Sequence, residues 1–590
     1  MRVIHADVAV VGAGGTGLRA AIAVVEKNPS LKVALISKVY PMRSHTVAAE
    51  GGAAGVYQDI DSLEDHFNDT VAGGDWLCDQ DAVDYFVQHC PVELTQLEHW
   101  GCPWSRREDG TVNVRSFGGM KINRTWFAAD KSGFHMLHTL FQTSIKYPNI
   151  ERYDEYFATD FIVEDGRCQG VVAIEVKTGE PTVFLAPSVV LASGGAGRVF
   201  RFNTNGAIVT GDGHGMALRA GAPLRDMEFV QYHPTCLPGS GILITEGCRG
   251  EGGIMMNKDG YRYLQDYGLG PETPVGQPKN KYMELGPRDK LSQAFWHESQ
   301  KGRTIDTPLG DVVHLDMRHL GEKFLHERLP LICSLAKNYV NADPVYQPVP
   351  VRPAVHYTMG GVRANKKCVS DIPGLFTAGE CSSVGIHGAN RLGSNSLVEI
   401  VVFGKVAGDS AADFAPQATL SDEKKLLEQA KSHLDRIEQM RHMDGDEKTS
   451  HIRQEMVKSM EKSFGIYRTG EGMLEGVNKI AELRDRITRI KIKDQTKPFN
   501  TELLQAFELQ SSLAVAQCMA VGGYERKESR GAHQRIDEFN KRDDEHFLNH
   551  TIAYYNGEKA PRLEYEPVNI TRSKPQERVY GAAAEKAAQK

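Results

Sequence analysis

Ala6-Asp-Val-Ala-Val-Val11 and the directly following Gly12-Ala-Gly-Gly-Thr-Gly17 decide the fold at the start of this chain. The first segment is a short apolar run, which is typical of a buried parallel strand. Residues 18–27 have a helical pattern that stops at Asn28-Pro29, and residues 32–37 form a second apolar run. The order strand, glycine-rich turn, helix and strand predicts a βαβ unit of the dinucleotide-binding type.

The glycines of this turn predict a phosphate-binding loop. Gly12, Gly14 and Gly17 have the G-x-G-x-x-G spacing, and the helix that follows turns backbone N–H groups and a positive dipole end toward a pyrophosphate. A tight turn without a ligand is the simpler alternative for such a motif. The acid that usually binds the ribose is replaced by Ser37-Lys38, so this region alone leaves both FAD and NAD open.

Two later apolar segments, 186–194 and 374–380, also end in glycines and predict further strands of the same sheet. Glu380, in Thr377-Ala-Gly-Glu380, resembles the second FAD signature of flavoproteins with two dinucleotide-binding motifs, in which the acid reaches the ribityl chain. Asp212, in Thr210-Gly-Asp-Gly213, is a second polar candidate near the phosphates. Together with the first motif, these acids favour FAD over NAD.

The chain has 590 residues, which exceeds the length that a single hydrophobic core usually accommodates. Residues 231–352 are rich in Gly, Pro and charge, whereas residues 421–490 are rich in Lys and Glu with apolar residues at helical spacing. We therefore expect an α/β fold: a Rossmann-like FAD-binding domain (1–230 and 353–416), an inserted α+β capping domain (231–352), a helical domain (417–545) and a small C-terminal segment of little periodicity (546–590).

Composition excludes several classes of protein. The net charge of −7 argues against a nucleic-acid partner. The ten cysteines include no C-x-x-C, which disfavours a metal site or an iron–sulfur cluster held by this chain alone, and we expect reduced thiols. No apolar run approaches 18 residues, so we expect a cytoplasmic chain without a membrane span.

Arg43-Ser-His-Thr-Val-Ala-Ala-Glu-Gly-Gly52 resembles the flavin-attachment segment of the fumarate reductase and succinate dehydrogenase flavoproteins. The resemblance extends from residue 6 to about residue 580, and it includes Gly118-Gly119, Gly194-Gly-Ala-Gly-Arg198 and Glu528-Ser-Arg-Gly-Ala-His-Gln-Arg535. It implies that His45 is bonded to the 8α-methyl carbon of FAD. This chemistry is reasonable because a neutral imidazole is nucleophilic and the flavin withdraws electrons from that methyl group.

Within this family the chain is most similar to the bacterial quinol-oxidising fumarate reductases. Glu50 favours that branch, because succinate dehydrogenases usually have Gln there, and Gly73-Gly-Asp-Trp-Leu-Cys78 is also similar to it. Succinate dehydrogenase remains an alternative. L-aspartate oxidase, which lacks the flavin-linking histidine, and a non-catalytic nucleotide-binding scaffold are more distant ones.

Arg391-Leu-Gly-Ser-Asn-Ser-Leu-Val-Glu399 predicts a helix start, in which Ser396 and Glu399 form an S-x-x-E capping box. The positive end of that helix would stabilise an anionic reduced flavin. The motifs and the resemblance together assign the following residues to FAD: Gly12, Ala13, Gly14, Gly15, Thr16, Ser37, Lys38, Ser44, His45, Thr46, Glu50, Gly51, Gly52, Asp212, Glu380, Arg391, Ser396 and Leu397.

Fumarate and succinate carry two carboxylates, so their site requires cationic and hydrogen-bonding groups at both ends and one proton donor. The resemblance assigns the carboxylates to His233, Thr245, His356 and Arg391, and leaves His387 as a structural residue.

The resemblance names Arg288 as the proton donor, which Glu246 and Arg249 supply with protons. Free guanidinium is a very weak acid. The alternative is therefore that Arg288 only stabilises negative charge while His233 gives the proton.

The resemblance also implies the partners. Electrons would come from an iron–sulfur subunit that is connected to quinone-binding membrane-anchor subunits. The expected location is the cytoplasmic face of the bacterial inner membrane, and the expected role is anaerobic respiration.

Overall fold

The computed structural model describes residues 1–269, 283–557 and 559–578, and it confirms the predicted βαβ unit. Strand β2 (Val8–Val11) is followed by helix α1 (Gly15–Lys27) and strand β3 (Val33–Ser37). The two strands are parallel, with Val8 opposite Val33 and Val11 opposite Ile36. All residues of both strands are buried, as the apolar runs predict.

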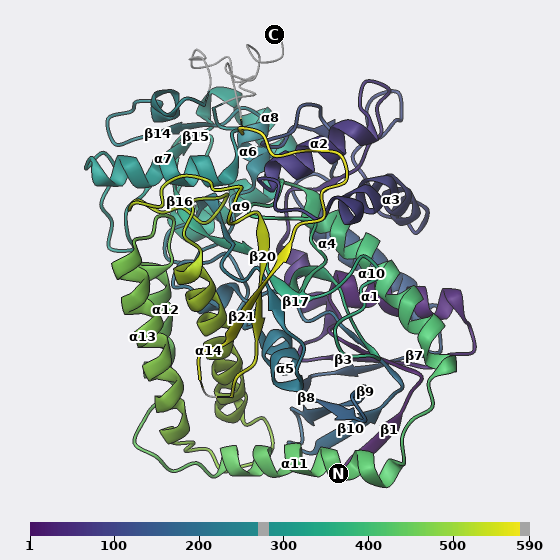
Figure 1. Ribbon diagram of the computed structural model, residues 1–590. Helices are drawn as coiled ribbons and strands as arrows, with labels where there is room; N and C mark the ends of the chain where they lie inside the picture. The colour runs from purple at the N-terminus through teal and green to yellow at the C-terminus, as the bar shows by residue number, and fades with distance from the viewer. Residues whose placement is uncertain (270–282, 558, 579–590) are drawn as a thin grey trace.

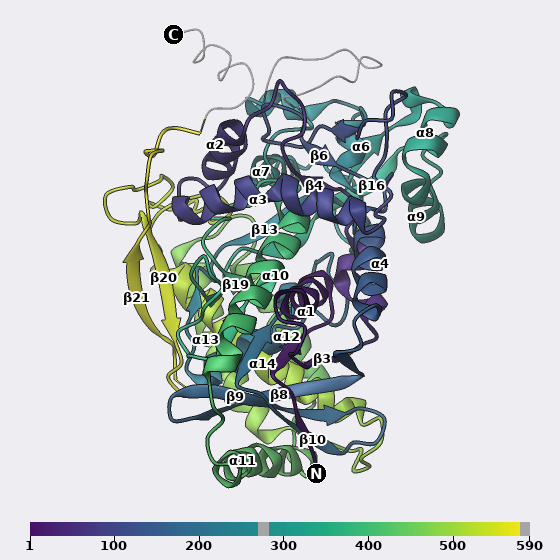
Figure 2. The same ribbon diagram turned by 90° about the vertical axis from the view of Figure 1, so that its right-hand side faces the viewer.

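The central sheet has the strand order β18-β11-β2-β3-β7 and is parallel throughout. Strands β11 (Ser188–Leu191) and β18 (Leu375–Thr377) confirm the two predicted strands in 186–194 and 374–380, and β7 (Ile150–Asp154) closes the other edge. Helix α10 (Asn395–Phe414) packs along α1, as Figure 2 shows. A Cβ atom at Gly408 would overlap the carbonyl oxygen of Ala20, so the two helices approach closely because this residue is glycine.

A second sheet, with the order β1-β10-β9-β8, lies beside the N-terminus at the bottom of Figure 1. The other helices and strands before residue 221 are β1 (Arg2–His5), β4 (Ala53–Ala54), α2 (Leu63–Gly73), α3 (Gln80–His99), β5 (Val114–Arg115), β6 (Thr125–Trp126), α4 (Ser132–Ile145), β8 (Tyr156–Glu164), β9 (Arg167–Glu175), β10 (Pro181–Leu185) and α5 (Asp212–Ala220).

The region expected to form the capping domain lies at the top of Figure 1 and is built on an antiparallel sheet of order β13-β16-β15-β14. Its strands are β13 (Val230–Cys236), β14 (Ile254–Met256), β15 (Val313–Asp316) and β16 (Val349–Thr358), and its helices are α6 (Glu246–Gly250), α7 (Arg288–Gln300), α8 (Glu322–Arg328) and α9 (Pro330–Val340). The expected limits 231 and 352 fall inside β13 and β16, so both strands continue into the FAD-binding region.

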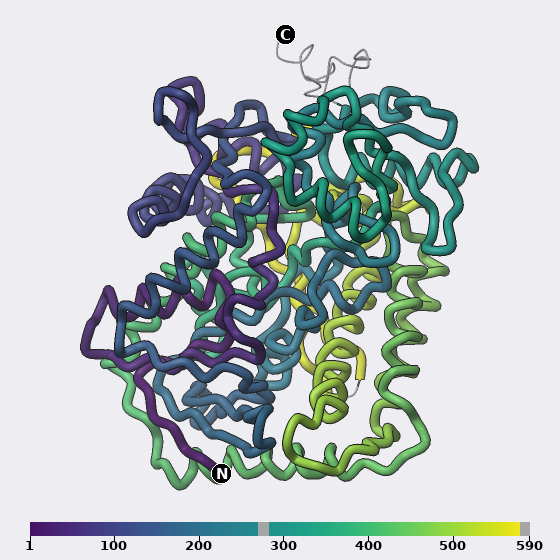
Figure 3. Tube along the Cα trace, turned by 180° about the vertical axis from the view of Figure 1, so that it is seen from behind, coloured from purple at the N-terminus to yellow at the C-terminus, as the bar shows by residue number. Residues whose placement is uncertain are grey.

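The predicted helical domain consists of α11 (Glu423–Arg441), α12 (Thr449–Ser463), α13 (Gly470–Arg486) and α14 (Thr501–Glu525). The apolar residues at helical spacing face inward: Leu426, Ala430 and Ile437 are buried, and Leu427 and Leu434 are partly buried. Helices α12, α13 and α14 stand side by side, and α11 runs below the N-terminal sheets; Figure 3 shows the same arrangement from behind.

The C-terminal segment is more regular than its sequence suggests. Strands β20 (Asn549–Tyr554) and β21 (Arg562–Pro567) are antiparallel and extend a sheet of order β19-β17-β12-β20-β21. The other strands are β12 (Leu224–Arg225), β17 (Gly361–Arg363) and β19 (Ser382–Ser383). Tertiary pairing with β12 therefore forms strands where local periodicity is weak. The alanine-rich end, from residue 579, lies outside the described residues.

All ten cysteines fall in the described ranges, where they are buried and carry free thiols. Over the same ranges, no three His, Cys, Asp or Glu side chains gather as metal ligands. None of the described helices is long and apolar enough to cross a bilayer.

Candidate active site

A cavity of about 430 Å³ lies at the carboxyl ends of the central strands, where open α/β sheets bind their ligands. Most residues assigned to FAD line it, from the glycine-rich turn to Glu380 and the start of α10. His356, one of the predicted substrate residues, lines it as well. Gly51, Gly52 and Arg391 do not line the cavity: Gly51 lies against Phe117 and Gly52 against Trp126.

The glycine-rich turn has the geometry that a pyrophosphate requires. Gly12 has φ +110°, and a Cβ atom there would overlap the carbonyl oxygen of Ala192. A Cβ atom at Gly17 would overlap the carbonyl oxygen of Gly12. Gly14 is the N-cap residue of α1 and has no side chain that could cap the helix. N–H groups of the first turn can therefore bind a phosphate.

The segment Ser37-Lys38 has partners that the sequence did not indicate. The Ser37 hydroxyl donates to the carbonyl of Val39 at 2.6 Å. Lys38 Nζ lies 2.6 Å from Asp212 and 3.0 Å from Glu508. Burial alone would lower the pKa of Lys38, but these two carboxylates raise it. Asp212, which lines the cavity, is therefore held in an ion pair.

His45 begins a short 3-10 helix and lines the cavity. Its Nδ1 accepts the N–H of Gly206 at 3.3 Å, and its Nε2 lies 3.4 Å from Asn205 Nδ2. Burial, with the nearby cation of Arg198, lowers the pKa of His45 to about 4. The imidazole is therefore neutral near pH 7, which is the nucleophilic form.

A second group of predicted residues gathers beside this cavity. Arg288, the first residue of α7, donates from Nε to Glu246 Oε2 at 2.8 Å and from Nη1 to Gln231 Oε1 at 3.2 Å. Glu246 also accepts the N–H of Gly118, and Arg249 Nη2 lies 3.9 Å from its Oε2. The structure therefore brings together Arg288, Glu246 and Arg249, as the resemblance implies.

The electrostatics of this group favour a bound anion. Burial would raise the pKa of Glu246, but the cations of Arg288 and Arg249 lower it, so the carboxylate is charged. Burial and the cation of Arg288 lower the pKa of Arg391 to about 10, which leaves Arg391 charged near pH 7. Burial and the cation of Arg288 also lower the pKa of Arg249, so three guanidinium groups lie near one another in this buried region.

His233 and His356 lie next to each other, with ring centroids 5.2 Å apart. Burial lowers the pKa of each well below its usual range, and the cation of Arg288 adds to the effect. His356 Nδ1 is 2.8 Å from Thr204 Oγ1. Both rings are therefore neutral near pH 7 and act as hydrogen-bonding groups rather than proton sources.

Several buried polar atoms of this group have no hydrogen-bond partner within the described part of the chain. They are Nε and Nη2 of Arg391, Nε and Nη2 of Arg249, and Nε2 of His233. Leaving a buried donor unsatisfied costs about 1–3 kcal/mol. Their convergence from separate elements indicates a site for an anionic ligand that accepts hydrogen bonds.

Thr245 and Glu50 join the two groups of residues. The N–H of Thr245 donates to Glu50 Oε2 at 3.1 Å, and the Thr245 hydroxyl caps α6 by accepting from Gly247 N at 3.2 Å. Glu50 is five residues after His45. The flavin-attachment segment is thereby connected to the residues around Arg288.

The predicted capping box at the start of α10 is wrong. The N-cap residue is Ser394, with φ +66°, and Ser396 lies inside the first turn. The carboxylate of Glu399 instead accepts from Tyr357 Oη at 2.6 Å and contacts His387 Nε2 at 2.7 Å. The Glu399 side chain therefore binds residues outside α10 instead of capping the start of the helix. His387 belongs to this buried triad.

Sequence reasoning missed Gln231 as a site residue. Its amide donates to the Arg391 carbonyl at 2.7 Å and accepts from Arg288, so it connects the two arginines. Gln231 precedes His233 by two positions on β13, and residues two apart share one face of a strand. That spacing was the available indication.

The nucleotide-binding turn, the second acid at Glu380 and the cavity that both of them line define a flavoprotein of the FAD-binding class. The family model described as FAD binding domain matches residues 7–397, and the one described as Fumarate reductase flavoprotein C-term matches residues 453–580. The chain belongs to the fumarate reductase and succinate dehydrogenase flavoprotein family.

Individual relatives agree with this assignment. The chain is 63% identical over 588 residues to the fumarate reductase flavoprotein subunit of Escherichia coli, covering 100% of this chain and 98% of that one. It is 64% identical over 585 residues to the subunit of Proteus vulgaris, covering 99% and 98%. A solved structure of quinol-fumarate reductase with menaquinol molecules superposes with a TM-score of 0.96 at 63% identity, over 98% of this chain and 100% of that one.

Proposed function

We propose that this chain is the catalytic flavoprotein subunit of a fumarate reductase and reduces fumarate to succinate in a reversible reaction. Electrons would reach it from an iron–sulfur subunit and, through membrane-anchor subunits, from quinol during anaerobic respiration. Relatives named as this subunit match nearly the whole chain at 62–65% identity. One of the similar structures is named for the quinol enzyme with menaquinol.

The observation that carries the proposal is the convergence of Arg249, Arg288 and Arg391 on one buried region with unpartnered donors. A four-carbon dianion can pair with these guanidinium groups and accept the open hydrogen bonds. In this arrangement His233, Thr245, His356 and Arg391 hold the two carboxylates. Withdrawal of charge toward these donors makes the alkene carbons electron-poor.

The remaining residues supply the proton. Arg288 gives it to the substrate, and Glu246 and Arg249 return it from solvent. The neutral His233 is a poor proton source, which favours Arg288 over the alternative donor. Arginine suits this role only in a buried site where other cations surround it, and the neighbours of Arg288 include two other guanidinium groups.

FAD, when bound in this cavity, would supply the hydride. The cradle at Gly12–Thr16 would hold the pyrophosphate, Glu380 the ribityl chain and His45 the covalent bond, while Ser396 and Leu397 would contact the flavin. The unpartnered hydroxyls of Ser44 and Ser193, buried at the same cavity, are further groups for the cofactor to satisfy.

We also propose that the chain is held at the cytoplasmic face of the bacterial inner membrane by its partner subunits. The division into an FAD-binding domain (1–230 and 353–416), a capping domain (231–352), a helical domain (417–545) and a C-terminal segment (546–590) is also part of the proposal. Succinate dehydrogenase is the second candidate, because the chain is 41% identical to such a subunit from Rickettsia bellii over 96% of its length.

The test is an assay of the purified holoenzyme with a reduced viologen dye and fumarate, and with succinate and an oxidising dye. We expect turnover in both directions, faster toward succinate. A faster rate of succinate oxidation would favour the second candidate. Absence of turnover by a protein that contains its FAD would overturn the proposal.

A further inference from the structure

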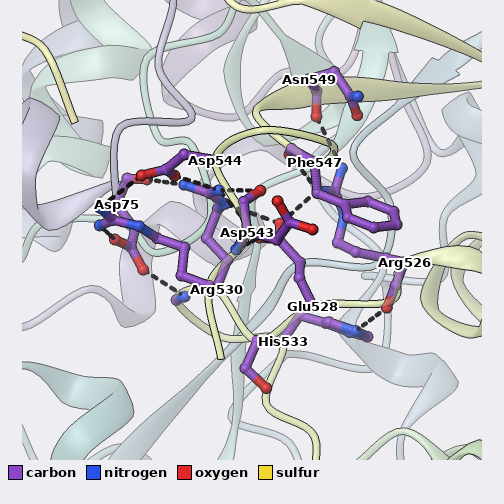
Figure 4. A network of polar contacts seen from close by, with 12 residues as sticks. Asp75, Arg526, Glu528, Arg530, His533, Asp543, Asp544, Phe547 and Asn549 are labelled. Atoms are coloured by element: carbon purple, nitrogen blue, oxygen red, sulfur yellow. Dashed lines mark hydrogen bonds and ion pairs between the residues drawn. The ribbon is translucent and has the colours of Figure 1, made fainter. Parts of the chain in front are cut away.

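The segment Gly73-Gly-Asp-Trp-Leu-Cys78 does not line the FAD cavity but forms a junction with two C-terminal segments. Asp75 accepts from Arg542 Nη1 at 2.8 Å and from the N–H of Gly531 at 3.0 Å, and its carbonyl accepts from Arg530 at 2.9 Å. Asp75 and Trp76 both have positive φ, +54° and +57°. Figure 4 shows Asp75 at one end of this polar network and Glu528 within it.

The end of the described chain runs along the same segment. Gln80 Oε1 accepts the backbone N–H groups of residues 571, 572 and 573, and Gln80 Nε2 donates to the Ser573 carbonyl at 2.6 Å. Trp76 Nε1 donates to Ser573 Oγ at 3.0 Å. In Figures 1 and 2 this part of the chain climbs past α2 toward α7.

At the end of that path, Arg578 reaches the start of α7. Its Nη1 lies 2.9 Å from Asp289 Oδ2 and its Nη2 lies 3.3 Å from Asp289 Oδ1, so the guanidinium group contacts both oxygens. Arg578 Nη1 also lies 3.6 Å from Asp75 Oδ2. The side chains of Arg578, Asp289 and Asp75 are only 7%, 3% and 7% exposed.

Asp289 directly follows Arg288 in the first turn of α7. That turn has no capping side chain, because its N-cap residue is Pro287. Among the described residues, Asp289 forms an ion pair with no cation besides Arg578. A two-pronged contact of this kind fixes direction as well as distance, so the position of Arg578 constrains the turn that carries Arg288.

We propose that Arg578 is a positioning residue for the substrate site: by pairing with both Asp289 and Asp75, it ties the first turn of α7 to the FAD-binding part of the molecule. The pair holds Arg288 in place for fumarate without touching the substrate. This inference rests on the proposed function, because it takes Arg288 as a substrate-site residue. The contact between Arg578 and Asp75 also gives the Gly73–Cys78 segment a role outside flavin binding.

The test compares Arg578→Ala, Arg578→Lys, Asp289→Asn and the double variant Arg578→Ala/Asp289→Asn in the flavin-loaded complex. The matched control is Arg572→Ala, in the same segment, because Arg572 pairs with Asp84 and Glu64 and is 42% exposed. Fumarate reduction with reduced viologen gives KM and kcat, and hydrogen exchange reports on the backbone of residues 288–292.

We expect Arg578→Ala to lower kcat/KM about tenfold, mainly through a higher KM, because a smaller fraction of molecules has Arg288 in place. Asp289→Asn should cause a similar loss, and the double variant should lose no more than the worse single variant, because the two residues act as one unit. Arg578→Lys should recover part of the activity. Amides 288–292 should exchange faster in Arg578→Ala and not in Arg572→Ala.

Three results overturn the inference: kinetics of Arg578→Ala equal to those of Arg572→Ala, losses that add fully in the double variant, or unchanged exchange at residues 288–292. An inactive wild type would instead overturn the proposed function. The two failures are therefore distinguishable.

Discussion

Arg288 Nε lies 2.8 Å from Glu246 Oε2, and both side chains are buried, with 8% and 0% exposure. Arg288 comes from the start of α7 and Glu246 from the start of α6, so the contact depends on how two short segments meet. The Glu246 carboxylate also accepts from Gly118 of the FAD-binding region. This pair therefore connects Arg288, the proposed proton donor, to the FAD-binding region.

Glu246→Gln should separate proton supply from substrate binding. The amide keeps the size of the side chain and an oxygen for Gly118, but it cannot take up and release a proton. We expect kcat for fumarate to fall by about a hundredfold or more, with KM within a few-fold of wild type and FAD content unchanged. Steady-state kinetics with reduced viologen measure both constants.

The matched control is Glu251→Gln, because Glu251 lies at the end of α6 and pairs with Arg328. It should keep wild-type kcat. A kcat for Glu246→Gln within threefold of that control would remove Glu246 from the proton pathway.

His45→Ser should abolish the covalent bond to FAD while leaving the cradle at Gly12–Thr16 intact. We expect yellow protein that releases all of its flavin on acid precipitation, whereas wild type keeps its flavin. Fluorescence of the precipitate measures the difference, and His5→Ser, at an exposed position, is the control. Flavin that stays bound after acid treatment of His45→Ser would place the covalent bond elsewhere.

His550 predicts a pH dependence of stability. Burial would lower its pKa, but Asp226 and Asp79 raise it to about 9. A pKa raised above the unfolded value of about 6.5 means that the stabilisation is complete below pH 6.5 and is lost as pH rises through about 9. The shift corresponds to at most about 3 kcal/mol.

Thermal unfolding at pH 6 and pH 9.5 tests this prediction. His550→Gln should unfold at a lower temperature than wild type at pH 6 and at nearly the same temperature as wild type at pH 9.5. His546→Gln, at an exposed position, should unfold like wild type at both pH values. An equal deficit for His550→Gln at the two pH values would show that its charge contributes nothing.

Sequence patterns predicted the elements whose causes are local. The apolar run at residues 6–11 and the glycines after it specify β2 and α1 because strand burial and turn geometry depend on a few adjacent residues. Most of the assigned cofactor residues line one cavity, and those that follow the central strands do so for the same reason: strand ends of a parallel sheet meet at one edge.

Features that depend on distant partners could not be predicted. Glu399 matched a capping box, yet Tyr357 and His387 bind its carboxylate. Lys38 stood where a ribose-binding acid was expected, and its partner Glu508 lies 470 positions away. Arg578 contacts Asp289 across 289 positions. No local pattern encodes such pairs, because their formation depends on how the folded segments meet.

The most direct test of the proposed mechanism is fumarate reduction by Arg288→Lys, with Arg303→Lys as the control at an exposed position. Lysine keeps the positive charge but lacks the planar fork that contacts Glu246 and Gln231. We predict near-complete loss of turnover with covalent FAD still present, and normal turnover in the control. Substantial fumarate reduction by Arg288→Lys would contradict the assignment of Arg288 as the proton donor.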